Sequence, residues 1–427
     1  MPLVTVSGGH SDTIAIPITS IANARLAQLL LDGVSGGVNA GTITPYSFSG
    51  SGQLFPPAGP SMLNLTGPGK VTIPATTATV VVSSTGRDTI NGGTALSQLV
   101  ISGAGGITYV ANSGSGTVIA GGGNNVITVG LTGFGDDEDG HGQHGHDDND
   151  HQDGHDHGGG GAPPAVPGSH LVLTDAGNDS ITVGAGAVTI SAGLGRNDIT
   201  LGSGIAQIIT TGRDWIQAGS GSATVDATMG QAILWGGAGQ LTFLGGAMAS
   251  TVVGGTGAVT AIGGAGGGVF LGAWGGNNSL TGGTGAVTLF GAGGGDRLTG
   301  NSATGDMLIA GSGLETLLGA TGRDTLIASA GRTTMTGGAG FDRFVFVRGL
   351  AGGQDLITDF NPGNDQLVMY GYGRGEFANA LRFASHNSAG STVTMSDHTR
   401  ITFGGLTLDD LRTIIVATPS DDYPGRH

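Results

Sequence analysis

The amino-acid sequence predicts an all-β protein in which the chain winds into a parallel β-roll, or β-solenoid, with two repeats of about nine residues in each turn. Two observations support this fold class. Gly occupies 89 of the 427 residues and aromatic residues only 5%, a composition unlike that of a layered globular domain. Residues 276–346 divide into consecutive blocks of about nine residues, each with an apolar fifth place. Such units bury their apolar side chains only by stacking on one another.

The fifth place of each block is predicted to point into the solenoid. In the clearest stretch this place holds Leu280, Leu289, Leu298, Leu308, Leu317, Leu326, Met335 and Phe344. In the preceding blocks it holds residues such as Ile181, Ile199, Ile216, Leu234, Phe243 and Phe270. Gly supplies the tight corners between the short strands, because it adopts positive φ without steric cost.

The N-terminal residues 1–68 do not follow the repeat and are predicted to form a cap that contains one helix. Ser20, or Thr19 before it, is the expected N-cap, and Gly33 the expected end of the helix. The apolar residues expected on one helical face are Ile21, Leu26, Leu29 and Leu30. A cap is expected because the open β-edge of a solenoid would otherwise pair with another chain.

The rest of the chain divides by composition into four segments. The repeats begin in residues 69–131, are interrupted by a His- and Asp-rich insertion at 132–167 that is expected to be a disordered loop, and resume in the main solenoid at 168–346. Residues 347–427 are predicted to form a C-terminal cap and secretion region with a β-hairpin, turning at 396–399, and a short helix.

The charge of the chain limits its partners. Formal net charge is −16 and no basic cluster is present, which argues against nucleic acid. No apolar run reaches the roughly 20 residues of a membrane-spanning helix. Cys is absent, so thiolate metal sites are excluded. The sequence is expected to belong to a secreted protein that leaves the cell without a standard cleaved N-terminal signal.

Carboxylate and amide side chains recur at the third place of the blocks. Because two blocks complete one turn, the third places of alternate blocks lie on the same edge of the solenoid. One edge is expected to carry Asp179, Asn197 and Asp214 and, further along, Asp306, Asp324 and Asp342, and the other edge Asn278, Asp296 and Glu315. Carboxylates stacked at a strand spacing of about 4.8 Å would repel one another. A bound cation relieves this repulsion, and oxygen ligands favour Ca²⁺.

Three blocks resemble the RTX family of calcium-binding nonapeptide repeats, whose motif is G-G-x-G-x-D-x-U-x with U apolar. They are GGAGFDRFV from Gly337, GATGRDTLI from Gly319 and DAGNDSITV from Asp175. The resemblance implies Ca²⁺ as the cofactor and type I secretion as the export route. It implies that Asp179, Asp214, Asp296, Asp324 and Asp342 are the ligand aspartates, with carbonyl oxygens of the preceding Gly residues. Residues 354–369 resemble the segment that follows the repeats in secreted proteases.

The blocks between residues 231 and 275 depart from this motif. Their third places hold Ala232, Leu241, Ser250, Val259 and Gly268, which cannot hold calcium through a side chain. These coils are expected to be stabilised by packing and backbone hydrogen bonds alone.

The insertion at 132–167 is a second candidate metal site. It contains His141, His144, His146, His151, His155 and His157 among many Asp residues. Imidazole pairs of this kind can chelate Zn²⁺, Ni²⁺ or Cu²⁺. The alternative is a hydrated loop that holds no metal.

The sixth place of the blocks is frequently apolar and is expected to face outward. Trp235, Leu244, Val253, Ile262, Leu271 and Phe290 occupy it. A continuous stripe would provide a surface for self-association or for contact with a cell surface or matrix. The alternative is that the roll is wider and these residues belong to its core.

Motifs for catalysis are weak. HExxH does not occur, and the G-x-S-x-G match at residues 33–37 does not join a strand to a helix. The function predicted is therefore that of a non-catalytic, secreted, calcium-binding structural solenoid in adhesion, a matrix or a surface layer. A polysaccharide-acting enzyme or enzyme accessory module, and a transition-metal-binding protein that uses the His-rich loop, are the alternatives.

Overall fold

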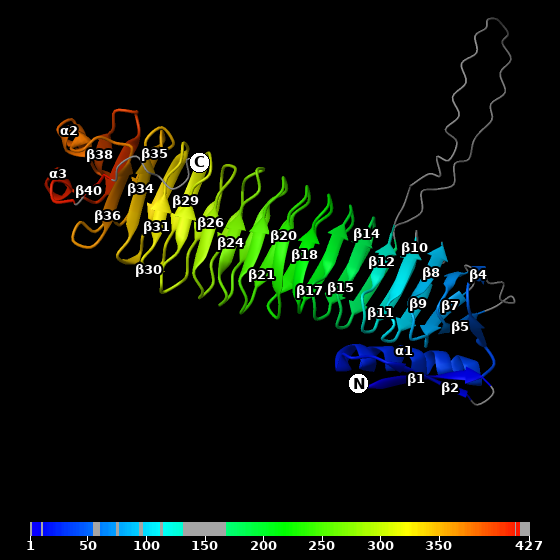
Figure 1. Ribbon diagram of the computed structural model, residues 1–427. Helices are drawn as coiled ribbons and strands as arrows, with labels where there is room; N and C mark the ends of the chain where they lie inside the picture. Colours follow the sequence, from blue (N-terminus) through cyan, green and yellow to red (C-terminus); the bar gives the residue numbers. More distant parts are fainter. Residues whose placement is uncertain are drawn as a thin grey trace, which may run out of the picture.

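The computed structural model describes residues 2–9, 12–53, 60–73, 77–93, 97–111, 114–130, 168–414 and 416–418. Its main body is a parallel β-solenoid, with small helices near the two ends (Figure 1). The predicted fold class is confirmed.

Two parallel sheets run the length of the solenoid and face each other across its core. Sheet I consists of β3 (Thr44–Ser49), β5 (Ser61–Gly67), β7 (Thr77–Val82), β9 (Ser97–Ser102), β11 (Ser115–Ala120), β13 (Ser169–Thr174), β15 (Ala187–Ala192), β17 (Ala206–Thr210), β19 (Ala223–Ala227), β21 (Leu241–Gly245), β23 (Val259–Ile262), β25 (Ser279–Thr281), β27 (Arg297–Thr299), β29 (Leu314–Leu318), β32 (Arg332–Thr336), β35 (Gln354–Ile357) and β39 (Arg400–Gly404). Sheet II consists of β4 (Gly52–Gln53), β6 (Lys70–Thr72), β8 (Asp88–Gly93), β10 (Ile107–Ala111), β12 (Val126–Val129), β14 (Ser180–Val183), β16 (Asp198–Leu201), β18 (Arg213–Gln217), β20 (Gln231–Trp235), β22 (Ser250–Val253), β24 (Gly268–Leu271), β26 (Val287–Phe290), β28 (Met307–Ile309), β31 (Thr325–Ile327), β34 (Arg343–Val347), β36 (Gln366–Tyr370) and β40 (Val416–Ala417). A short pair, β30 (Thr321–Gly322) and β33 (Ala339–Gly340), joins two turns at their edge.

Each strand pairs with the equivalent strand of the next turn. Ser180 of β14 lies opposite Asp198 of β16, and Ile181 lies opposite Ile199. This offset of 18 residues means that two blocks make one turn, as predicted. The strands on either side of the insertion, β11 and β13, pair without a break in register.

The predicted inward column is confirmed. Leu280, Leu289, Leu298, Leu308, Leu317, Leu326, Met335 and Phe344 are fully buried, as are Ile199, Ile216, Leu234, Phe243 and Phe270, and Ile181 nearly so. The columns of the two sheets meet across the core. The rings of Phe243 on sheet I and Phe270 on sheet II, for example, make an edge contact with centroids 5.6 Å apart.

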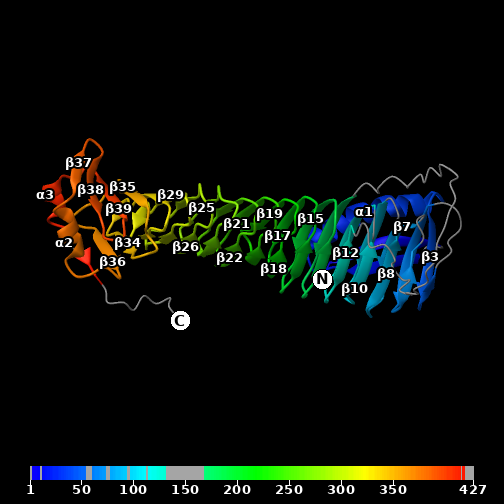
Figure 2. The same cartoon turned by 90° about the horizontal axis from the view of Figure 1, so that it is seen from above.

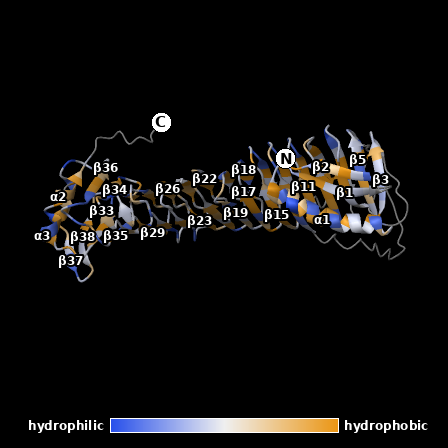
Figure 3. Cartoon of the chain, turned by 90° about the horizontal axis from the view of Figure 1, so that it is seen from below, coloured by the Kyte–Doolittle hydropathy of each residue, from blue (hydrophilic) through white to orange (hydrophobic). Residues whose placement is uncertain are grey.

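The N-terminal segment covers a flank of the solenoid and not its end face. It contains the antiparallel strands β1 (Leu3–Gly9) and β2 (Asp12–Pro17) and the helix α1 (Ile21–Asn39), which lies along the outside of the first turns (Figures 2 and 3). Beneath it, sheet I presents the outward apolar side chains Met62, Val81, Ile101, Ile119 and Leu173. The stacked turns already begin at β3, inside the segment 1–68 that was expected to be the cap.

Helix α1 begins as predicted but extends further. Ser20 is the N-cap, and its hydroxyl accepts the N–H of Asn23 at 3.3 Å. The prediction that Gly33 ends the helix is wrong, since α1 continues to Asn39 and Val34 is buried against the solenoid. The predicted apolar face is also wrong in part: Ile21 and Leu29 are exposed, and the helix buries Ala24, Ala27, Leu31 and Val34 instead. The small Ala residues allow close approach to sheet I.

The C-terminal segment closes the other end of the solenoid. β37 (Ser385–Asn387), β38 (Gly390–Thr394) and β39 form the antiparallel part, and β39 also continues sheet I beside β35. The predicted hairpin of β38 and β39 and the predicted short helix α3 (Leu408–Leu411) are both present. The additional helix α2 (Glu376–Leu381) packs through the buried ring of Phe377.

The predicted outward stripe is divided between two faces. Trp235, Val253, Leu271 and Phe290 follow one another on the outer face of sheet II. Leu244 and Ile262 lie on sheet I, on the opposite side of the solenoid. The single continuous stripe is therefore wrong, because successive blocks alternate between the two sheets.

Candidate metal centre

The third-place side chains of the repeats lie inside the turns, not on a solvated edge. Every predicted calcium-ligand candidate has at most 4% of its surface exposed, and Asp324 and Asp342 have none. All nine stack in the expected groups, Asp179, Asn197, Asp214, Asp306, Asp324 and Asp342 beside sheet II and Asn278, Asp296 and Glu315 beside sheet I. Burial of so many ionisable groups requires compensation by hydrogen bonds, protons or cations.

Four successive turns carry Asp306, Asp324, Asp342 and Asp365, and we call this row the carboxylate ladder. The N–H of Asp306 donates to Oδ1 of Asp324 at 2.6 Å, and the N–H of Asp324 donates to Oδ1 of Asp342 at 2.9 Å. The N–H of Asp342 donates to Oδ1 of Asp365 at 3.1 Å. Each carboxylate thus binds the backbone of the turn before it, and like charges lie next to one another.

Earlier along the same edge, Asn125, Asp179, Asn197 and Asp214 form the mixed ladder. The N–H and Nδ2 of Asn125 both donate to Oδ1 of Asp179, at 2.8 and 2.9 Å. Asn197 repeats the pattern toward Oδ1 of Asp214, with its N–H at 3.2 Å and its Nδ2 at 2.8 Å. An amide therefore separates the two carboxylates, and each carboxylate accepts an additional hydrogen bond.

The edge beside sheet I carries a shorter row. Asn278 donates its N–H and its Nδ2 to Oδ1 of Asp296, both at 2.8 Å. Glu315 follows in the next turn. The N–H groups of Gly311 and Asp296 act to lower the pKa of Glu315, but neither carboxylate oxygen makes a hydrogen bond of ordinary geometry within the described part of the chain. This row therefore ends on a buried carboxylate that the protein compensates only weakly.

Several buried carboxylate oxygens make no hydrogen bond of ordinary geometry among the described residues. They are Oδ2 of Asp88, Asp179, Asp214, Asp324, Asp342 and Asp355, and both oxygens of Glu315. By contrast, Oδ2 of Asp306 accepts the N–H groups of Asn301 and Ser302, and Oδ2 of Asp296 accepts the N–H of Ala292. The predicted carboxylate ligands thus fall into two classes. In one class both oxygens accept hydrogen bonds from the protein, and in the other at least one oxygen accepts none.

The electrostatics of the unsatisfied group favour the protonated acid in the absence of a cation. Burial raises the pKa of Asp324 to about 7, although the N–H of Asp306 acts in the opposite direction, and the charges of Asp342 and Asp306 add to the rise. Burial raises the pKa of Asp214 to about 7 and that of Glu315 to about 8. Near neutral pH a large fraction of these carboxyl groups therefore holds a proton unless a cation replaces it.

The unsatisfied oxygens fit a hard divalent cation. Glycines keep the space beside them open: a Cβ on Gly319 or on Gly337 would lie 2.5 Å from Oδ2 of Asp324 or of Asp342. Among the described residues no three His, Cys, Asp or Glu side chains converge. Main-chain carbonyl oxygens would have to complete the shell of 6–8 oxygens that Ca²⁺ takes.

Sequence analysis missed four members of these rows. Asp88, Asn125, Asp355 and Asp365 are buried at the same place as the predicted residues. Each stands two residues before a buried Ile or Leu, as in Asp365-Gln366-Leu367. An Asp or Asn in this position relative to the inward residue is the signal that would have identified them.

Comparison with known families agrees with this geometry. A family model for RTX calcium-binding nonapeptide repeats matches residues 173–208, 275–304 and 309–344, in four copies. These segments are RTX repeats. No curated protein and no solved structure gives a significant match. Asp214 and Asp306 lie just outside the matched ranges, and the other calcium-ligand candidates lie within them.

The turns between the matched RTX repeats keep the fold without ligands. Ala232, Leu241 and Val259 occupy the third place and are buried as packing residues. Ser250 provides the remaining side-chain acceptor there, since its hydroxyl accepts the N–H of Ala232 at 3.2 Å. The period of the RTX repeats is therefore maintained by packing where the carboxylates are missing, as predicted.

The second predicted metal site falls outside the described residues. It comprises His141, His144, His146, His151, His155 and His157 of the insertion. The prediction of Zn²⁺, Ni²⁺ or Cu²⁺ binding by these residues stays a prediction.

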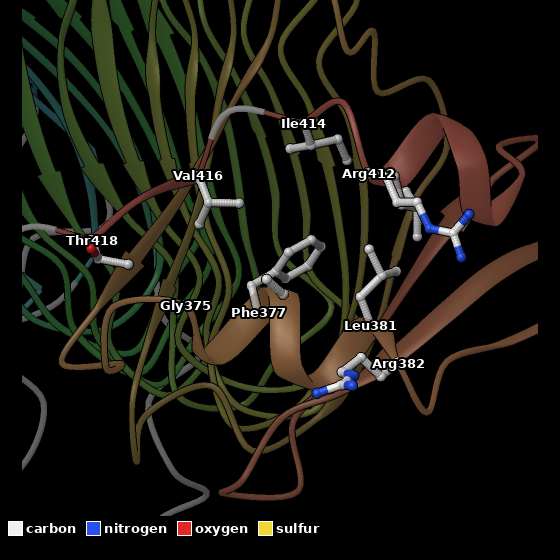
Figure 4. Close-up of a pocket in the computed structure, with 10 residues that line it drawn as sticks. Gly375, Phe377, Leu381, Arg382, Arg412, Ile414, Val416 and Thr418 are labelled. Carbon is white, nitrogen blue, oxygen red and sulfur yellow. The ribbon is translucent and has the colours of Figure 1, made fainter.

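A separate hollow lies in the C-terminal segment. It has a volume of about 420 Å³ and lies between α2, α3 and β40, with Phe377, Leu381 and Ile414 around it and Arg382 and Arg412 at its edge (Figure 4). Arg412 forms an ion pair with Asp409. None of the lining residues belongs to a ladder, so this hollow is no part of the candidate metal centre.

Proposed function

We propose that this protein is a non-catalytic, calcium-stabilised structural solenoid that acts outside the cell, in adhesion, an extracellular matrix or a surface layer. The observation that carries the proposal is that Oδ2 of Asp179, Asp214, Asp324 and Asp342, in the two ladders beside sheet II, is buried without a hydrogen-bond partner within the described part of the chain. The RTX repeats that contain most of these residues are calcium-binding. Calcium would replace the protons that the metal-free acids retain.

Calcium-linked folding gives an extracellular role a physical basis. A cation that binds the folded chain and not the unfolded chain stabilises the folded state in proportion to the logarithm of its concentration. Calcium is scarce inside cells and abundant outside them, so the chain would remain loosely folded before export and become ordered afterwards. Among the described residues, no helix is long and apolar enough to cross a membrane.

The test is thermal unfolding followed by circular dichroism, in EGTA and in millimolar CaCl₂. The proposal expects Tm to rise with calcium concentration, and isothermal titration to give a saturable stoichiometry. Millimolar MgCl₂ is the control, because Mg²⁺ requires a small octahedral shell and dehydrates reluctantly. An equal Tm in EGTA and in calcium would contradict the proposal.

A further inference from the structure

An exposed aromatic pair lies on the outer face of sheet II, away from the buried ladders. Trp215 of β18 and Trp235 of β20 stack with ring centroids 4.7 Å apart and ring planes 20° from parallel. Trp215 nevertheless exposes 53% of its surface. A large indole on a solenoid face contributes most to stability when it is buried. Its exposure, in an orientation fixed by stacking, indicates a contact surface.

The strand before Trp215 leaves room beside this ring. The residue that lies next to Trp215 on β16 is Asp198, whose side chain is much shorter. The result is a hollow of about 470 Å³ across β16, β18 and β20. Its size is within the range of small-ligand sites. The hollow is lined by Arg196, Asp198, Arg213, Trp215, Gln231 and Ile233, with the buried Asn197 and Asp214 behind them.

The polar groups around the hollow are available for a ligand. Arg196 and Arg213 are exposed, and neither guanidinium forms a hydrogen bond or ion pair within the described part of the chain. The guanidinium groups supply donors and the carboxylate of Asp198 supplies acceptors. The amide of Gln231 already donates one N–H to the carbonyl oxygen of Ala249 at 2.6 Å, and offers its oxygen and its other N–H. A ligand that matches this set needs hydroxyl groups, which donate and accept, around an apolar face that packs on indole.

We propose that the hollow beside Trp215 binds an uncharged polysaccharide, with a pyranose ring packed against Trp215 and its hydroxyl groups bonded to Arg196, Asp198, Arg213 and Gln231. The net charge of −16 disfavours polyanions, including nucleic acid and polyuronates. The parallel strands of sheet II repeat equivalent outward positions in each turn, which suits an extended chain of sugars. This inference names a partner for the adhesion or matrix part of the proposed function and does not depend on calcium.

Tryptophan fluorescence provides a direct test, because the chain has only 3 Trp residues and two of them form this pair. The full chain in calcium is titrated with hexasaccharides of β-1,4-glucose, β-1,4-mannose, β-1,4-xylose, β-1,4-N-acetylglucosamine and α-1,4-glucose, and with hexagalacturonate. Saturable quenching by at least one uncharged hexasaccharide is expected. No change with any of them, or tighter binding of hexagalacturonate, would overturn the proposal.

Variants locate the site. Trp215→Ala and Arg213→Gln are expected to weaken binding about tenfold or more. The third tryptophan supplies the matched control: Trp274, 78% exposed in the turn after β24, lies outside the hollow, and Trp274→Ala should leave affinity unchanged. Arg297→Gln, at an exposed position on sheet I, is the control for arginine. Equal losses in controls and site variants would overturn the assignment. The calcium dependence of Tm is measured separately, so either proposal can fail alone.

Discussion

The mixed ladder and the carboxylate ladder lie on the same edge of sheet II but compensate buried charge differently. In the mixed ladder, Asn125 and Asn197 alternate with Asp179 and Asp214, and each amide Nδ2 donates to the carboxylate of the next turn. In the carboxylate ladder, Asp324 and Asp342 each accept only one backbone N–H and lie between other carboxylates. The first row thus compensates its buried carboxylates in part with hydrogen bonds from its own amide side chains. The second row depends on protons or cations from solution.

This difference shows that the apolar column and the third-place residues of the repeats are two separate properties. The inward apolar column is continuous through both ladders and through the middle turns, where the third place holds Ala232 or Val259. The ladder residues vary without interrupting it. We infer that the column determines the fold and that the third place determines how strongly each turn responds to calcium.

Asn197→Asp should have the largest effect, because it would turn the mixed ladder into a second carboxylate row. The change removes the Nδ2 donor to Asp214 and places three carboxylates in successive turns. In EGTA the free energy of unfolding should fall by about 2–4 kcal/mol, as measured by urea denaturation. Calcium should restore much of this loss.

The matched control is Asn178→Asp at the neighbouring exposed position, where Oδ1 accepts the N–H of Arg196 and is retained in Asp. It should change stability by less than about 0.5 kcal/mol. A similar loss in both variants would show that the buried amide has no special role.

Asp324→Asn is the reverse exchange and should have a smaller effect of opposite sign. The Oδ1 that accepts the N–H of Asp306 remains, and the new amide gains the carboxylate of Asp342 as an acceptor, as Asn197 does with Asp214. In EGTA the free energy of unfolding should be about 1–2 kcal/mol higher than that of the wild type. The increase in Tm on adding calcium should be smaller than in the wild type. Asp409→Asn, at an exposed surface ion pair, should alter neither. An undiminished calcium response would remove Asp324 from the ligand set.

The pH dependence of stability should also differ with and without calcium. Burial raises the pKa of Asp324 from its ordinary value of 3.8 to about 7, so the folded chain binds this proton more tightly than the unfolded chain. The stabilisation of the folded state by the proton on Asp324 is therefore complete below pH 3.8 and is lost as the pH rises through 7. In EGTA, Tm should fall by about 2–4 °C between pH 5 and pH 8. In calcium the trend should reverse, because the cation binds the ionised carboxylates. A Tm in EGTA that rises with pH over this range would contradict the raised pKa.

Sequence reasoning predicted the column and the ladders because both depend on a local period. The spacing from Asp324 to Leu326 is enough to place one at the edge and the other in the core. It did not predict the course of α1, since which face of the helix is buried depends on the apolar row Met62, Val81 and Ile101 of distant turns. It placed the carboxylates at the edges of the turns but did not predict that they are buried, because burial of a turn depends on its neighbours on both sides. The Trp215–Trp235 stack was missed for the same reason: the two residues are in successive turns of sheet II.

Ser250→Ala should have the smallest effect, and it tests whether the middle turns are independent of calcium. The Ser250 hydroxyl accepts the N–H of Ala232 in place of the carboxylate found in the ladders. Removing it should lower the free energy of unfolding by about 1 kcal/mol, the contribution of one hydrogen bond. The loss should be equal in EGTA and in calcium, since no carboxylate lies at the third place of the neighbouring turns, Ala232 and Gly268. Ser220→Ala, in an exposed turn, is the matched control and should be neutral. If calcium instead altered the loss at Ser250, the effect of bound calcium would reach turns that carry no ligand, and stability would be shared along the whole solenoid instead of being set turn by turn.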